Sequence, residues 1–182
     1  NHNFYIITST EDKDYKNCKG ILVHNCGEIV MGVDSCRLMI TPLHHFVLYP
    51  FTEKAKFDYK KFGKAVEIAQ RLMDDLIDLE IECIDKIIHK IKKDPEKEEI
   101  KKIELDLWKQ LKQTCIDGRR TGLGVNSLAD TLASLNIKYG SEESYKVVDK
   151  IFETFAVHSM KSSCEMAKEL GSFPLYNKDL EY

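Results

Sequence analysis

The pattern of hydrophobic and polar positions divides the chain into a β-type beginning and a helical remainder. Residues 1–25 contain two short runs of strand-forming residues, FYIIT and GILVHN, and the charged segment STEDKDYKNCK between them predicts a hairpin loop. From residue 26 to about residue 52 the pattern is irregular. There CRLMI and HFVLYPF predict strands, Pro42 and Pro50 interrupt them, and no helix fits.

Two long helices follow. Apolar residues at three- and four-residue spacing predict an amphipathic helix over residues 60–93. Asp94 and Pro95 then supply an N-cap and a proline at the first helical position, and the same spacing over residues 96–116 completes a predicted helical hairpin. The expected core positions are Ala69, Leu72, Met73, Leu76, Ile84, Ile87, Ile88, Ile91, Ile100, Ile103, Leu107, Leu111 and Cys115.

Two further helices are predicted after the segment GRRTGLG, whose GLG at residues 122–124 is too short for a dinucleotide loop and favours a turn. Leu128, Leu132 and Leu135 mark the third helix. Gly140 and Ser141 cap a fourth, which runs toward Gly171 and Pro174. Its apolar positions are Val148, Ile151, Phe152 and Phe155.

Composition narrows the class of protein. The 182 residues are 43% hydrophobic and 31% charged, with a formal net charge of −3, which gives no field that favours nucleic acid or an anionic membrane surface. No apolar run reaches membrane-span length and no leader opens the chain, so we expect a cytoplasmic protein. The six cysteines are scattered, which argues against a disulfide scaffold or a zinc site. Because the first residue is Asn, we expect an upstream portion to be missing.

The stretch around Asn25 has the residues for self-cleavage of the backbone. An asparagine side chain can attack its own carbonyl, close a succinimide and release the next residue, and a neighbouring imidazole accelerates such a step by about 10²–10⁴-fold. His24 precedes Asn25, and the thiol of Cys26 can accept an acyl group as a nucleophile.

These residues resemble the end of an intein, with NHNFYI at residues 1–6 and GILVHN at residues 20–25 as its last two sequence blocks. The resemblance implies that Asn25 cyclises, that His24 and His2 assist, and that Cys26 begins the downstream host. About a dozen residues, Cys18 among them, separate the two blocks where inteins normally have a few. The N-terminal intein portion is not in the sequence, and a His-Asn turn on a surface hairpin is the alternative interpretation.

A second chemistry begins at the same cysteine. In an extended segment, Cys26 and Glu28 point to the same face, and Gly27 leaves room for a substrate to approach the backbone. A thiol yields a sulfur radical easily, while a carboxylate can take a proton from a hydroxyl on the same substrate carbon. The pair suits radical removal of a C–H hydrogen next to an ionising O–H, although C-x-E alone is a weak signal.

Residues 26–182 resemble the ribonucleotide reductases, with the adenosylcobalamin-dependent class most similar. The segments that carry the resemblance are CGEIVMGVDSCRL, GRRTGLG, LADTLASL and CEMAKELGSFP. It implies that Cys26 becomes the thiyl radical that removes the ribose 3′-hydrogen, that Glu28 deprotonates the 3′-hydroxyl, and that Cys36 is one of the two reducing cysteines, whose partner we expect upstream. His24 stands where the family has an active-site asparagine, which we expect before the insertion.

The resemblance implies an α/β fold class: a mainly helical fragment of the ten-stranded α/β barrel over residues 26–182, with Cys26 at the tip of a central loop, behind the all-β intein remnant of residues 1–25. Adenosylcobalamin would be bound mainly outside the fragment. The implied partners are a ribonucleotide, diphosphate or triphosphate, a nucleotide effector and a thioredoxin-type reductant.

Other conspicuous residues are interpreted as structural. Arg119 and Arg120 orient a strand-to-helix turn rather than bind phosphate, while Cys83, Cys115 and Trp108 belong to the core. His44 and His45 have no carboxylate pattern beside them, so no metal is assigned. Two alternatives to the enzyme stay open: a self-processing split-intein fragment that cleaves at Asn25, and a helical interaction module without an active site.

Overall fold

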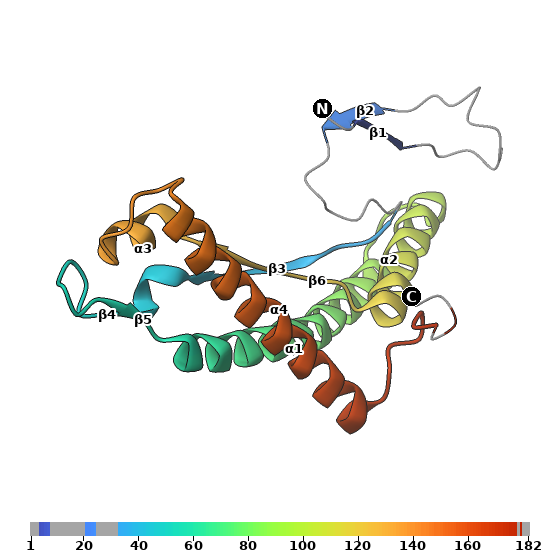
Figure 1. The fold of residues 1–182 in the computed structure, drawn as a ribbon. Coiled ribbons are helices and arrows are strands. Elements are labelled where there is room, and N and C mark those ends of the chain that lie inside the picture. Colours follow the sequence, from blue (N-terminus) through green and yellow to red (C-terminus); the bar gives the residue numbers. More distant parts are fainter. Residues whose placement is uncertain (1–3, 8–20, 25–32, 178, 180–182) are drawn as a thin grey trace. The chain divides into compact units, whose positions relative to one another are not determined.

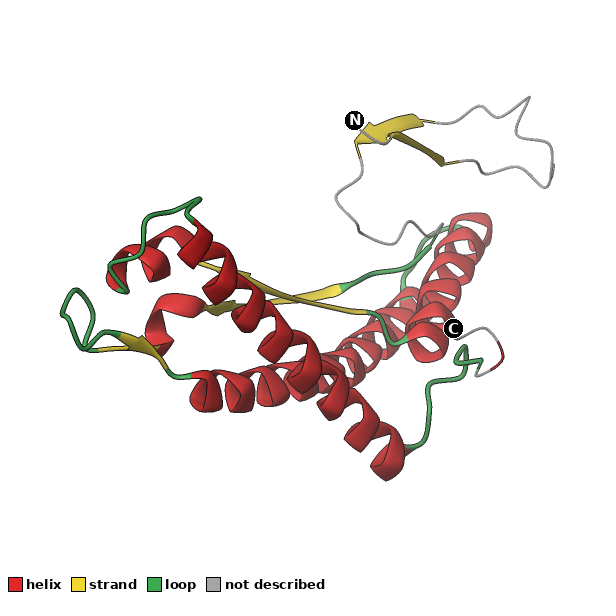
Figure 2. Ribbon diagram, viewed as in Figure 1, coloured by secondary structure: helices red, strands yellow, loops and turns green. Residues whose placement is uncertain are grey.

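The computed structural model describes residues 4–7, 21–24, 33–177 and 179. The chain divides into two units, Asn1–Asp34 and Ser35–Tyr182, and each is described by itself. The described residues are mostly helical, with three sheets of two strands each (Figure 2). None of the helices in these ranges is long and apolar enough to cross a membrane.

The first unit contains the hairpin that the sequence predicts. Strand β1, Phe4–Ile7, pairs antiparallel with β2, Ile21–His24, and Phe4 lies opposite His24. The predicted loop between the strands lies outside the described residues. The boundary at residue 25 between an intein segment and an enzyme segment stays a prediction.

The second unit is built on a parallel pair of strands and the helices that connect them. Strand β3, Arg37–Pro42, pairs with β6, Thr121–Asn126, from Arg37 opposite Thr121 to Pro42 opposite Asn126. Parallel strands need a long crossover, and here it includes α1, Tyr59–Lys93, and α2, Glu98–Gly118. Helix α1 is central, because it contacts both strands, α2 and the last helix α4, Glu142–Leu170 (Figure 1).

Two hydrophobic clusters hold these elements together. The larger one joins α1, α4 and the segment after β3, and its aromatic rings pack edge-on: the Phe62 and Phe46 centroids are 5.2 Å apart and those of Phe62 and Phe57 5.4 Å. The smaller one joins α1 to α2 through Ile84, Ile88 and Cys115. Trp108 packs against this second cluster and Cys115 is fully buried, as predicted.

The predicted helical hairpin is confirmed, but its turn is placed differently. Asp94 ends α1 as its C-cap in an extended conformation, and α2 begins only at Glu98, after Lys97. The extended conformation of Asp94 is the one that a residue before proline favours, and it ends α1; Pro95 lies in the turn between the helices and not at the first position of α2. The fourth helix begins as predicted, with the Ser141 side chain accepting a hydrogen bond from the Ser144 amide.

The predicted strand HFVLYPF is largely wrong. Leu43–Phe46 forms a 3-10 helix, η2, and only the two residues of β4, Val47–Leu48, are strand, paired with β5, Lys56–Phe57. In a 3-10 helix, positions i and i+3 eclipse, which brings Leu43 and Phe46 onto the same side of η2, and both are buried.

The predicted turn at GLG is also wrong, since residues 122–124 lie in β6. The third helix is confirmed as α3, Leu128–Ser134, with Leu135 as its C-cap. Several expected core positions are exposed instead, as is Cys83. They are Leu72, Leu76, Ile100, Ile103, Leu107 and Phe152. A single helical stripe cannot pack on every side, and within Ser35–Tyr182 the buried stripe of α1 runs through Met73, Ile77, Ile84 and Ile88.

Candidate functional site

The predicted site residues are unevenly covered by the structure. His2, Asn25, Cys26 and Glu28 lie outside the described residues. His24 is the last residue of β2, in the first unit. Cys36 is described, and it is therefore the residue on which the geometry of the candidate site is built.

Cys36 immediately precedes β3, and its side chain is exposed on one face of the β3–β6 sheet. Side chains alternate along a strand, so Leu38 and Ile40 lie on the same face, where they are 64% and 59% exposed. Their register partners on β6 are Gly122 and Gly124. We call the surface formed by these five residues the open face.

The glycines of β6 explain how the open face is formed. A Cβ built on Gly122 would lie 2.6 Å from Leu38 Cδ2 and 3.4 Å from Cys36 Sγ, so both side chains extend over the backbone of Gly122. A Cβ on Gly124 would meet only the Met39 carbonyl oxygen, at 3.9 Å. Glycine thus permits the thiol and Leu38 to approach the neighbouring strand closely.

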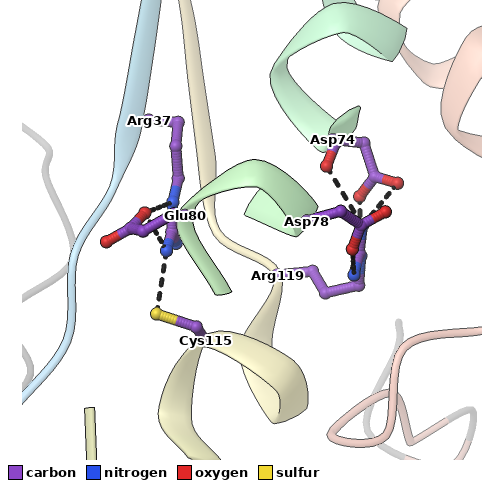
Figure 3. A network of polar contacts seen from close by, with 6 residues as sticks. All are labelled: Arg37, Asp74, Asp78, Glu80, Cys115 and Arg119. Atoms are coloured by element: carbon purple, nitrogen blue, oxygen red, sulfur yellow. Dashed lines mark hydrogen bonds and ion pairs between the residues drawn. The ribbon is translucent and has the colours of Figure 1, made fainter. Parts of the chain in front are cut away.

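The opposite face of β3 is covered by helices and contains a buried cation. Arg37 is only 8% exposed, and its guanidinium forms an ion pair with Glu80 of α1, as Figure 3 shows. Arg37 Nη2 also donates to Cys115 Sγ of α2 at 2.8 Å, and Nη1 donates to the Ser35 carbonyl oxygen at 2.9 Å. The Ser35 hydroxyl donates to the second Glu80 oxygen, Oε1, at 2.8 Å. We call Ser35, Arg37, Glu80 and Cys115 the Arg37 clamp.

Arg119 forms a second guanidinium–carboxylate group, which is shown beside the first in Figure 3. It ends α2 in the left-handed conformation, with φ of 40°, and binds Asp74 through Nε and Nη2 and Asp78 through Nη1. Hydrogen bonds to Asp74 and Asp78 raise the pKa of Arg119 further above its already high range. Its structural role is confirmed, but the turn that it stabilises runs from a helix to a strand, not the reverse.

Arg120 follows in the same turn. A Cβ on Gly118 would lie 3.3 Å from Arg120 Nε, so the Arg120 side chain folds back over the end of α2. The Arg120 carbonyl oxygen accepts a bond of 3.4 Å from the Arg37 amide, which links this turn to the start of β3.

A polar group between α1 and α4 was not predicted from the sequence. The buried Glu67 accepts hydrogen bonds from Lys64 at 3.1 Å, His158 Nδ1 at 2.8 Å and Lys161 at 2.9 Å, while its carbonyl oxygen accepts one from Ser162. The bonds from Lys161, His158 and Lys64 lower the pKa of Glu67 to about 2. We call these five residues the Glu67 cluster.

His44 and His45 both lie in η2, exposed, with ring centroids 4.3 Å apart. In the ranges that the structure describes, no group of three or more His, Cys, Asp or Glu side chains is arranged to hold a metal ion. Three of the four described cysteines of the second unit are exposed, Cys36, Cys83 and Cys164, and of these Cys36 is the one that the resemblance assigns to the site.

Comparison with known proteins connects this geometry to a family. The model of the family described as ribonucleotide reductase, barrel domain, matches residues 13–181. The chain is 27% identical over 152 residues to the ribonucleoside-diphosphate reductase subunit alpha of Chlamydia pneumoniae, which covers 84% of this chain and 12% of that protein.

Two other relatives give the same picture. The ribonucleoside-diphosphate reductase large subunit of Variola virus is 27% identical over 151 residues, 83% of this chain and 16% of the viral protein. The large chain from Cryptosporidium parvum is 23% identical over 176 residues, 95% of this chain and 19% of that protein. The chain thus spans less than a fifth of the length of these curated relatives.

Proposed function

This chain belongs to the ribonucleotide reductase barrel-domain family, and on that premise we propose that it is part of the catalytic barrel of an enzyme that reduces ribonucleotides to deoxyribonucleotides. The match over residues 13–181 carries the proposal, because it includes Cys26, Glu28 and Cys36. The relatives are named ribonucleoside-diphosphate reductases, so a diphosphate is the substrate to test first, ahead of a triphosphate.

The proposed reaction distributes three roles over these residues. A thiyl radical on Cys26 takes the 3′-hydrogen of the ribose, and Glu28 takes the proton of the 3′-hydroxyl. The bond between C2′ and its oxygen breaks and the oxygen leaves as water. Cys36 and a second thiol outside this sequence supply two hydrogens, one to the leaving water and one to C2′, and close a disulfide, which a thioredoxin-type reductant then reopens. Cys26 finally returns the hydrogen to C3′ and becomes a thiyl radical again.

The placement of Cys36 supports its part in this scheme. A reducing thiol must meet both the substrate and a second thiol, and Cys36 is exposed on the open face, whereas Cys115 is fully buried among the helices. Gly122 and Gly124 add no side chain to this face, so the Cys36 and Leu38 side chains can extend over the neighbouring strand.

The resemblance also names adenosylcobalamin, which would supply the radical that oxidises Cys26. The described residues include no group that the resemblance assigns to its binding. The nucleotide effector and the thioredoxin-type reductant are proposed on the same ground.

The test uses the complete, correctly joined enzyme with adenosylcobalamin, a dithiol reductant and a ribonucleoside diphosphate, and measures deoxyribonucleotide by chromatography. Cys26→Ser and Cys36→Ser are expected to reduce product to background, because serine neither carries the radical nor forms a disulfide. Cys83→Ser is the matched control, since Cys83 is exposed on α1 without an assigned role, and it is expected to retain activity. Undiminished turnover by Cys36→Ser would contradict the proposed role of Cys36.

A second candidate function concerns residues 1–25. The antiparallel pairing of β1 with β2 supports it, because these strands contain described residues of both intein-like blocks, with Phe4 opposite His24. In this proposal Asn25 cyclises, His24 and His2 assist, and Cys26 becomes the first residue of the released or joined host.

Intact mass separates the two candidates. The chain is mixed with the missing N-terminal intein portion and followed over time, with Asn25→Ala as the control that cannot cyclise. Loss of residues 1–25 from the chain but not from the control supports processing. Persistence of the full-length mass would contradict it and leave residues 13–25 to the enzyme that the family model matches.

A further inference from the structure

We propose that Arg37 is a positioning residue for Cys36, and that the Arg37 clamp fixes the direction in which the Cys36 thiol projects from the sheet. The inference deepens the proposed function, since it rests on Cys36 as a reducing thiol. It concerns the residues on the covered face of β3, which no resemblance assigned to any role.

The clamp holds both neighbours of Cys36 to the same carboxylate. Arg37 binds Glu80 through its guanidinium, and the Ser35 hydroxyl donates to the other Glu80 oxygen at 2.8 Å. Arg37 Nη1 further donates to the Ser35 carbonyl oxygen at 2.9 Å. The backbone on each side of Cys36 is thereby tied to α1, while the Cys36 side chain itself is left on the open face.

The burial of the clamp restricts the Arg37 guanidinium to one orientation. Arg37 is 8% exposed, and Cys115, which accepts from Nη2 at 2.8 Å, is fully buried. Water therefore has little access to replace these partners, and the planar guanidinium can satisfy them together in one orientation only. Since strand side chains alternate, fixing Arg37 on the helix side fixes its neighbour Cys36 on the opposite side.

Stability alone does not explain this arrangement. A buried ion pair is often no more stabilising than apolar side chains of similar size, because desolvation of the charges offsets their attraction. Apolar residues at positions 37 and 80 would fill the same space, but they would not tie Ser35 to the carboxylate or define one orientation of the strand. The direction of the thiol is what the polar clamp adds.

The experiment measures the alkylation rate of each cysteine in the full chain by peptide-mapping mass spectrometry, with Cys164 on α4 as the exposed internal reference. In the native chain one side of the Cys36 sulfur faces the backbone of Gly122, where a Cβ would lie 3.4 Å from it. Arg37→Met and Glu80→Gln are expected to raise the ratio of the Cys36 rate to the Cys164 rate by about threefold or more, because local opening exposes that side of the sulfur.

Arg119→Met is the matched control. It also removes a guanidinium from carboxylates of α1, but Arg119 does not flank Cys36, so the ratio is expected to stay unchanged. An unchanged ratio in both clamp variants would overturn the proposal, and so would an equal rise in Arg119→Met, which would indicate general loosening. If Arg37→Met does not fold, the isosteric Glu80→Gln decides.

The result is independent of turnover. If Cys36→Ser proves active in the joined enzyme, the reducing role of Cys36 fails while the alkylation result still stands. If the alkylation ratio does not respond but Cys36→Ser is inactive, the clamp proposal fails and the proposed function survives.

Discussion

The Arg37 clamp and the Glu67 cluster are two buried polar groups, and each contains a carboxylate of α1, Glu80 in the clamp and Glu67 in the cluster. Each places one charged side chain in a buried position, 8% exposed in both cases, and each satisfies it with partners that include residues of another helix. They differ in how those partners are reached. The Lys64 and Lys161 side chains, which surround Glu67, are 70% and 53% exposed, whereas in the clamp the Glu80 side chain is 29% exposed and Cys115 is fully buried.

This difference in exposure determines whether water can replace a hydrogen-bond partner that a substitution removes. A lost lysine near the surface can be substituted by solvent, and an ion pair of this kind contributes little to stability. A lost partner in the clamp leaves a polar atom where water cannot easily enter, which costs far more. We therefore expect substitutions in the clamp to lower the free energy of unfolding more than substitutions in the cluster, because water replaces the lost partner less well.

The largest expected effect is that of Arg37→Met on stability. The change leaves the Glu80 carboxylate partly buried without its cation, and we expect a loss of about 3 kcal/mol in the free energy of unfolding. Urea denaturation followed by circular dichroism measures it. The double variant Arg37→Met/Glu80→Gln is expected to recover part of the loss. A loss below about 1 kcal/mol in the single variant would mean that solvent replaces the guanidinium, and the contrast with the cluster would disappear.

Gly63→Ala is expected to have the next largest effect. A Cβ at Gly63 would lie 2.4 Å from His158 Nε2 and within 2.7 Å of two other ring atoms, so the ring must leave its place beside Glu67. Alanine favours a helix by about 1 kcal/mol over glycine, yet we expect a net loss of about 1–2 kcal/mol from the displaced ring.

Gly124→Ala is the control for this substitution. The nearest atom to a Cβ at that position is the Met39 carbonyl oxygen at 3.9 Å, so the free energy of unfolding is expected to change little. Stabilisation by Gly63→Ala, measured in the same urea experiment, would show that the His158 ring moves at no cost.

The smallest expected effect, about 1 kcal/mol at neutral pH, is that of Glu67→Gln, because two of the partners that it loses are solvated lysines. The Glu67 pKa is lowered from 4.5 to about 2 in the folded chain, so the stabilisation is fully present above pH 4.5 and is lost as the pH falls toward 2. Thermal unfolding between pH 2 and 6 should therefore show a shallower pH dependence in Glu67→Gln. An identical slope in both chains would contradict the assignment.

The sequence predicted those features that repeat along the chain. Periodic apolar residues located α1, α2, α3 and α4, and Ser141 marked the start of α4 because capping is a local interaction. The strand at CRLMI was also predicted, and it corresponds to β3. In each case neighbouring residues carry the whole signal.

Features that depend on distant residues were missed. GLG at 122–124 forms a strand because Leu38 and Ile40 of β3 pair with its glycines. The apolar residues of α1 likewise do not indicate which side of the helix another helix covers. Arg37, Glu80 and Cys115 are separated by more than 30 positions each, so no local pattern joins them. The chemistry of Cys36 came from the resemblance, while its exposed position came from the structure.

The parallel pairing of β3 with β6 has a consequence for how the chain is made. Arg37 lies opposite Thr121, so β3 is synthesised long before the strand that completes its backbone ladder. On the ribosome, α1 and α2 emerge after β3 but before β6, and their local hydrogen bonds can form while β3 has no partner strand. We therefore expect the helices of this unit to form before the sheet, and translation that stalls before residue 121 to leave an unpaired β3 able to associate with other nascent chains.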